Sequence, residues 1–318
     1  MNPLTLTRPS NAERASRVRF KNILFATDLT ASSASAQAYA LLLAQMFGSR
    51  LFVLYVQTGP GLAPRYEKAW TSQDHKGEGR AIAELESFFR ASQVPFTLLV
   101  EPGEVPEVLN RVVDENAIDL VILGTHGRKG FSHVLMGSMA ESVSRSSACP
   151  VITVGPRAGA GFERTLKTMV YATDFSQESR SALPYAISLA QEFHAELLVL
   201  HVAPEHMVHD RMQAEGYLMN RIKVVAPQSR FPWCTLRHRV EFGDPARRIL
   251  AVAKDQNADL IVLGLHSSVQ LTSHFPERLS YSIVCEASCP VMSVLPAARE
   301  TKLAKLTADF LRFAPLLN

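Results

Sequence analysis

The sequence is poor in cysteine and has no long hydrophobic run. Its four cysteines form no C-x-x-C pair and have no histidine at the spacing of a zinc site. We therefore expect reduced thiols in a cytoplasmic protein, although Cys285 and Cys289 lie one helical turn apart and could together meet a metal ion or an oxidant. The apolar stretch AYALLLAQMFG is shorter than the roughly 20 residues that cross a membrane. We expect a soluble protein with no membrane partner.

Charge of either sign is not in large excess. The formal net charge of +3 over 318 residues gives no electrostatic argument for binding DNA or RNA. The first twenty residues contain four arginines but no continuous apolar segment of the kind found in secretory signals. We interpret residues 1–19 as a flexible arm.

Two common phosphate-binding motifs are also missing. No G-x-x-x-x-G-K-[ST] occurs anywhere in the sequence, and no G-x-G-x-x-G follows the first expected strand. These absences argue against a P-loop ATPase and against a dinucleotide-binding domain.

The sequence does contain an internal repeat, which decides the expected architecture. Residues 22–56 align without gaps with residues 168–202, at an offset of 146. Further along, the offset falls to 140, where DLVILG is matched by DLIVLG and SACPVITV by ASCPVMSV. The first copy is therefore six residues longer somewhere between positions 57 and 100. The chain consists of two copies of one domain.

The expected boundaries follow from the repeat and from the residues around it. GPRAGAGFERT, between the copies, contains the glycine and proline of a linker. TKLAKLTADFLRFAPLL, after the second copy, has the spacing of an amphipathic helix. We expect a first domain at 20–155, a linker at 156–166, a second domain at 167–296 and a helical extension at 297–318.

Within each copy, short β-branched runs alternate with helix-length amphipathic stretches. In the first copy the runs are ILFAT, RLFVLYV, FTLLVE, LVILG and PVITV. This alternation predicts an α/β, Rossmann-like domain: a parallel, open sheet of five strands with helices on both faces. In open sheets of this kind, ligands bind beyond the carboxyl ends of the strands.

The stretch GTHGRKGFSHVLMGS follows the fourth expected strand and could cradle a phosphate. Gly124 and Gly127 permit backbone shapes that let N–H groups approach an anion. Gly137 and Ser138 precede an expected helix, whose N-terminus favours a phosphate, and Arg128 can add a charge-assisted contact. For the serine an alternative stays open, because a glutamate three residues later completes a helix capping box.

Three features together resemble the universal stress protein family: Gly-x-x-Gly-x9-Gly-Ser after the fourth strand, ATD at the end of the first, and CPVITV as the closing strand. The resemblance covers residues 20–155 and 165–296, so the chain looks like a tandem member. It implies that ATP, with Mg²⁺, binds the copy that carries the glycine pattern, and that the two domains pair through their fifth strands. A regulatory or signalling role in the stress response, an unidentified protein partner and a homodimer are in keeping with it.

The resemblance also implies a set of nucleotide contacts. Asp28 and Val56 would contact the ribose and adenine region. The cleft would be lined by residues at strand ends, namely Ala26, Thr27, Asp28, Val56, Leu123 and Gly124. The phosphates would be held by residues of the glycine motif, namely Gly127, Arg128, Gly137, Ser138 and Met139.

The second copy departs from this pattern. Two glycines and the serine of the motif are replaced by Ser267, Glu277 and Arg278. A carboxylate repels a phosphate, and the loss of glycine removes the permitted backbone shapes. We therefore expect one nucleotide per chain, in the first domain. Asp174 persists without the phosphate motif, so Asp28 can also be interpreted as a cap of the helix that follows it.

Two other function classes stay open. One is a ligand-free scaffold whose partners dock on the terminal segments. The other is an ATP-using nucleotidyl transferase of related fold, which would need a loop such as S-G-G-x-D-S where this sequence has ATDLTASS. We assign no catalytic residue, since no Ser/His/Asp order and no general base at a plausible spacing is visible. Slow ATP hydrolysis would come from water beside the bound phosphate.

Overall fold

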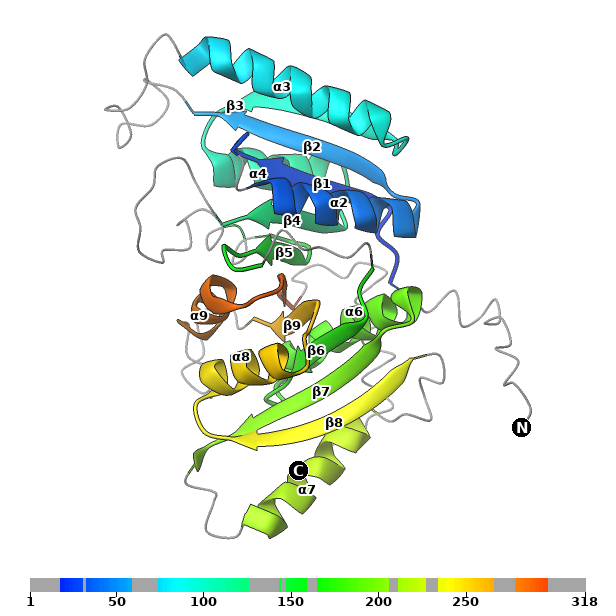
Figure 1. The fold of residues 1–318 in the computed structure, drawn as a ribbon, viewed down its shortest axis with the longest axis vertical. Coiled ribbons are helices and arrows are strands. Elements are labelled where there is room, and N and C mark those ends of the chain that lie inside the picture. Colours follow the sequence, from blue (N-terminus) through cyan, green and yellow to red (C-terminus); the bar gives the residue numbers. More distant parts are fainter. Residues whose placement is uncertain are drawn as a thin grey trace, which may run out of the picture.

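The computed structural model describes residues 18–30, 33–58, 74–125, 143, 147–158, 165–205, 211–226, 234–265 and 278–296. Strands and helices alternate along the chain, as the apolar pattern predicts (Figure 1). The first half contains β1 (Asn22–Thr27), α2 (Ala34–Phe47), β2 (Arg50–Gln57), α3 (Asp74–Ala91), β3 (Phe96–Pro102), α4 (Val105–Glu115), β4 (Leu120–Gly124) and β5 (Val151–Val154). The second half contains β6 (Thr168–Ala172), α6 (Gln177–Phe193), β7 (Glu196–Ala203), α7 (Arg211–Val225), β8 (Thr235–Phe242), α8 (Pro245–Asp255), β9 (Leu260–Gly264), α9 (Arg278–Glu286) and β10 (Val291–Val294).

All ten strands form one sheet, in the order β3-β2-β1-β4-β5-β10-β9-β6-β7-β8 (Figure 1). Each half is a parallel sheet of five strands, so the predicted fold class is confirmed. The halves meet where β5 and β10 pair antiparallel, with Ile152 opposite Met292. The expected pairing through the fifth strands is therefore also confirmed.

Helices cover both faces of this sheet. Buried side chains of α2, α3, α6 and α7 belong to one apolar cluster, and those of α4, α8 and α9 belong to another on the opposite face. β4 and β9 are buried along nearly their whole length. Such burial on both sides explains why DLVILG and DLIVLG are almost continuously hydrophobic.

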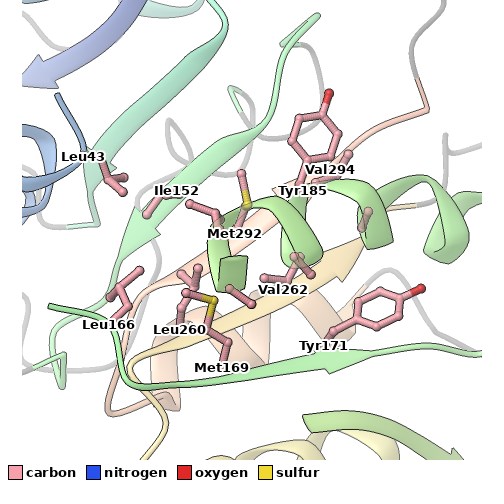
Figure 2. Packing of buried hydrophobic residues seen from close by; sticks show 14 of the residues in the cluster. Leu43, Ile152, Leu166, Met169, Tyr171, Tyr185, Leu260, Val262, Met292 and Val294 are labelled. Atoms are coloured by element: carbon pink, nitrogen blue, oxygen red, sulfur yellow. The ribbon is translucent and has the colours of Figure 1, made fainter. Parts of the chain in front are cut away.

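The two halves share a core where they meet. Figure 2 shows Ile152 of β5 and Met292 of β10 next to each other at the junction, and Tyr185 of α6 and Val294 belong to the same apolar cluster. The Tyr185 ring also stacks on Phe20, which precedes β1, with the ring centroids 6.3 Å apart. The apolar cluster on this face therefore runs from one domain into the other without a break.

Two equivalent tyrosines reach across this junction in opposite directions. Burial raises the pKa of Tyr39 of α2, and Cys289 of the second domain raises it further. Burial likewise raises the pKa of Tyr185, and there Cys149 of the first domain adds to the rise. The same electrostatic influence thus acts twice across the junction, as in a symmetric homodimer, but within one chain.

The segments flanking the repeats are described only in part. Val18, from the expected arm, and Ala158, from the expected linker, are both buried. Residues 1–17 of the arm, residues 159–164 and the extension at 297–318 lie outside the described residues. In the part of the chain that is described, no helix is both long and apolar enough to cross a membrane.

Candidate functional site

The first domain has a switch point between β1 and β4. From β1 the chain moves outward through β2 and β3, and it then returns to the other side of β1 as β4. Ala26 of β1 is in register with Leu54 on one side and with Leu123 on the other. The carboxyl ends of three neighbouring strands therefore meet at the edge where ligands bind in sheets of this type.

Six of the predicted contact residues lie at this edge, namely Ala26, Thr27, Asp28, Val56, Leu123 and Gly124. Val56 and Leu123 are buried in the cluster on the face covered by α4, and Ala26 packs against that cluster. The phosphate part of the prediction lies outside the described residues, namely Gly127, Arg128, Gly137, Ser138 and Met139.

The turn after β1 is held by its own side chains. The Thr27 hydroxyl accepts a hydrogen bond of 3.1 Å from the Leu29 amide and lies 2.9 Å from the Ser33 hydroxyl. Asp28 Oδ1 accepts hydrogen bonds from the amide and the hydroxyl of Thr30, at 3.0 and 2.7 Å. These bonds hold Leu29 in a left-handed backbone conformation with φ of 63°. The sequence ATDLT therefore fixes the direction in which the chain leaves the strand.

The second domain builds the same turn from equivalent residues. The Thr173 hydroxyl accepts from the Phe175 amide at 3.0 Å, and Asp174 Oδ1 accepts from the Ser176 amide at 2.9 Å. Phe175 has φ of 67°. Ser176 caps α6, since its hydroxyl accepts from the Ser179 amide at 3.0 Å. In this domain the aspartate side chain stabilises the turn, and the serine two residues later caps the helix.

The two aspartates differ at their second carboxylate oxygen. Asp28 Oδ2 is buried and has no hydrogen-bond partner in the described structure, whereas Asp174 has no buried carboxylate oxygen without a partner. Leaving a buried acceptor unpaired costs about 1 to 3 kcal/mol, and more when the group is charged. The first domain therefore presents, at its switch point, an acceptor that suits an N–H or O–H donor from a bound molecule.

A second buried atom without a partner lies in the same domain. Among the described residues, Thr153 Oγ1 is the one other buried side-chain oxygen or nitrogen that lacks a hydrogen bond. Thr153 is fully buried in β5 and is in register with Leu123. It lies two residues after Val151, so both side chains point to the face that also carries the Leu123 side chain. The sequence analysis missed it, because a threonine within the apolar run PVITV is ordinary for a strand.

Aromatic and basic side chains occupy the corresponding edge of the second domain. The His201 ring donates through Nδ1 to the Thr173 carbonyl at 2.7 Å, since a carbonyl can only accept. The same ring lies 4.3 Å from the ring of Phe175, and the Arg221 guanidinium lies 4.5 Å from the Phe175 centroid. The first domain has Tyr55 in place of the histidine and Leu29 in place of the phenylalanine. The two domains therefore share the turn but have different side chains at the carboxyl ends of their strands.

The cysteines do not form a reactive centre in the described structure. Burial raises the pKa of Cys149 and Cys234 to about 11 and that of Cys289 to about 12. Cys285 is buried as well. Because the thiolate is the form that binds metals and attacks oxidants, these values favour inert, protonated thiols. The suggestion that Cys285 and Cys289 meet a metal or an oxidant gains no support.

The sequence model of the family described as "Universal stress protein family" matches residues 19–155 and 165–294. The chain belongs to the universal stress protein family. It is a tandem member, with one family domain in each half of the ten-stranded sheet.

Individual relatives agree with this assignment. A universal stress protein of Mycolicibacterium smegmatis is 27% identical over 184 residues, which is 56% of this chain and 62% of the relative's own length. One from Methanocaldococcus jannaschii is 27% identical over 139 residues, 42% of this chain and 82% of that protein. The chain thus spans less than two thirds of the mycobacterial relative that it matches.

A solved structure shows the same fold. The universal stress protein from Archaeoglobus fulgidus DSM 4304 aligns with a TM-score of 0.68, covering 89% of this chain and all but 1% of the other. The sequence identity in that alignment is 19%. The likeness therefore concerns the arrangement of the two halves rather than the chemistry of any site.

Proposed function

We propose that this tandem universal stress protein binds ATP, with Mg²⁺, in its first domain, and that the bound nucleotide regulates a signalling role in the stress response. The observation that carries the proposal is the buried, unpaired Asp28 Oδ2 at the switch point of the first domain. A ribose offers hydroxyl donors, which are what such an acceptor lacks. Members of this family often bind ATP.

The residues around Asp28 fit the rest of the nucleotide. Ala26, Val56 and Leu123 supply apolar surface of the kind that covers a flat base. The glycine motif follows β4 directly, so its backbone N–H groups and Arg128 would bind the phosphates. Mg²⁺ would neutralise part of the phosphate charge. No residue is assigned a catalytic role, and the ligand acts by occupying the site.

The second domain serves as the structural partner in this proposal. It lacks two of the motif glycines and has Ser267 and Glu277 in their places. Its turn aspartate, Asp174, is not left without a partner, and His201, Phe175 and Arg221 stack at the corresponding strand ends. We therefore expect a stoichiometry of one ATP per chain.

Calorimetric titration of the full chain with MgATP tests the proposal. We expect one binding site in the unsubstituted chain and at least tenfold weaker binding in Gly137→Glu, which copies the second repeat into the first. Ser267→Gly, a change in the opposite repeat, is the matched control and should leave affinity and stoichiometry unchanged. Circular dichroism before each titration shows whether the variants are folded. Absence of binding to the unsubstituted chain, or equal affinity in a folded Gly137→Glu protein, would disprove the proposal.

A further inference from the structure

The sheet ends in two edge strands that occupy equivalent places in the two repeats. β3 closes one end of the sheet and β8 the other (Figure 1). At an offset of 140, residues 97–99 of β3 correspond to residues 237–239 of β8. The first set reads TLL and the second RHR. One domain therefore serves as an internal control for the other.

The β8 edge is protected by charge. Arg237 lies 2.9 Å from Glu196, and Arg239 lies 2.6 Å from Glu241 and 3.3 Å from Asp255. The apolar residues of this strand are all buried, namely Leu236, Val240 and Phe242. Long charged side chains along an open edge are a common means of preventing strand-to-strand association.

The β3 edge carries no charged side chain of its own from Phe96 to Val100, although Arg50 of β2 donates to Thr97 Oγ1 at 3.0 Å. None of its apolar residues is fully buried: Phe96, Leu98 and Leu99 are half-buried and Val100 is 37% exposed. Phe88 of α3 is 44% exposed. Phe89 links it to the strand, because the Phe89 ring centroid lies 5.3 Å from that of Phe88 and 5.7 Å from that of Phe96. We refer to Phe88, Phe96, Leu98, Leu99 and Val100 as the apolar edge.

Charge is absent from the centre of this strand. No charged residue occurs from Phe96 to Val100. The first one is Glu101, which already forms an ion pair of 3.2 Å with Arg111 of the same chain. In the described part of the chain, β2 is the one strand that pairs with β3, so the outer row of backbone N–H and C=O groups has no strand beside it. Uncharged, apolar edges of this kind are typical of pairing sites.

We propose that β3 pairs antiparallel with β3 of a second copy of the chain, around a two-fold axis at Leu98. In this register Phe96 lies opposite Val100 of the second copy, and Thr97 lies opposite Leu99. An aromatic residue opposite a β-branched one is a favourable cross-strand pair, and no charge faces a like charge. A two-fold arrangement closes on itself, so the association stops at a dimer.

A second copy fits this edge better than a foreign protein does. Each unlike pair occurs twice about the two-fold axis, and the charged groups at this edge already bond within the chain: Arg50 donates to Thr97 Oγ1 at 3.0 Å, and Glu101 pairs with Arg111. The other surface that could join two copies, at β5 and β10, is already used inside the chain. This inference is independent of the proposed nucleotide binding.

The first test is the mass of the full chain in solution, measured by size-exclusion chromatography with light scattering. We expect twice the chain mass of 35.1 kDa for the unsubstituted protein. Leu99→Arg, which copies Arg239 into the first repeat, should give the mass of one chain. Tyr217→Arg, at a side chain of α7 that is 64% exposed, is the matched control and should remain a dimer. A monomeric unsubstituted chain, or a folded Leu99→Arg dimer, would overturn the proposal.

The second test locates the interface without relying on a loss of association. Residues directly opposite in an antiparallel pair have Cα atoms about 4.5 to 5.5 Å apart, which a disulfide can bridge. Leu98→Cys should therefore give a covalent dimer under mild oxidation. His238→Cys, at the equivalent position of β8, and the unsubstituted chain should not. A dimer that forms without cross-linking through Leu98→Cys, or one that cross-links equally through His238→Cys, contradicts pairing through β3.

Discussion

The amide nitrogen of Val18 donates a hydrogen bond of 3.0 Å to the hydroxyl of Ser188, a residue 170 positions further along the chain. Both residues are buried. Val18 precedes the first strand of the first domain, and Ser188 belongs to α6 of the second. The two domains are therefore held together by a contact outside the β5–β10 strand pair, and the entrance to one domain depends on a helix of the other.

Replacing Ser188 by alanine should destabilise the whole chain. The buried Val18 amide would lose its acceptor, which costs about 1 to 3 kcal/mol. Ser181→Ala is the control, because the Ser181 hydroxyl donates only to a carbonyl of its own helix, and we expect a change within about 0.5 kcal/mol. Urea unfolding measures both free energies. Equal effects of the two substitutions would mean that the contact between the domains contributes nothing.

Replacing Asp28 by asparagine should weaken ATP binding. An amide has the same shape as the carboxylate, but it loses the charged acceptor at Oδ2 that we assign to the ribose. A hydrogen bond to a charged group contributes about 1.5 to 3 kcal/mol, so we expect a loss of affinity of at least tenfold in calorimetry. Asp174→Asn changes the equivalent residue of the second domain and should leave the affinity unchanged. If the two variants bind ATP equally well, Asp28 does not contact the ligand.

Replacing Gly155, which follows β5, by alanine should push β5 and α9 apart and lower the free energy of unfolding. A Cβ atom at Gly155 would lie 2.3 Å from the carbonyl oxygen of Val284 in α9. That oxygen is part of the backbone, so either α9 or β5 must move, and we expect a cost of about 1 to 3 kcal/mol. Gly216→Ala offers a control of opposite sign, because it lies inside α7 with nothing within 4 Å and should stabilise the protein by about 0.5 to 1 kcal/mol. Thermal unfolding of the two variants compares them directly.

Alkaline pH should destabilise the folded chain. The pKa of Cys149 is raised to about 11 and that of Cys289 to about 12, whereas unfolded thiols titrate near about 8.5. Above that value the unfolded state loses its thiol protons and the folded state keeps them, so the free energy of unfolding falls as pH rises. We expect a progressive loss between about pH 8.5 and 12, measured by urea unfolding at each pH. A double variant with Cys149→Ala and Cys289→Ala should show a shallower pH dependence.

Much of the fold can be predicted from the sequence, because the signals involved are local or repeated. The apolar runs place the five strands of the first copy, and the repeat extends this placement to the second copy, including β8, whose sequence TLRHRVEF is not itself an apolar run. The pairing of the halves through their fifth strands follows from the family resemblance. The start of α3 could not be placed in this way. It begins at Asp74, before the apolar periodicity starts, and its first turns are polar.

The site could be predicted only in part, since its signals are of two kinds. Asp28 follows a strand within a recognisable turn, so its position at the sheet edge can be inferred from the sequence. Thr153 gives no such signal, because whether a strand hydroxyl finds a partner depends on side chains that are distant in sequence. The bond between Val18 and Ser188 is hidden for the same reason, since 170 residues separate its two ends.

The joining of β5 and β10 within one polypeptide has a consequence for how the two halves can differ. In an assembly of separate chains, the halves part on dilution, whereas here the effective concentration of one half near the other is fixed by the covalent link. Within one chain, each half needs to be complementary only to the other half, and it does not need to be complementary to an identical copy of itself. Gly155 can therefore admit a close-packed helix where the second copy has Leu295. The covalent link thus allows one half to specialise without loss of the partnership.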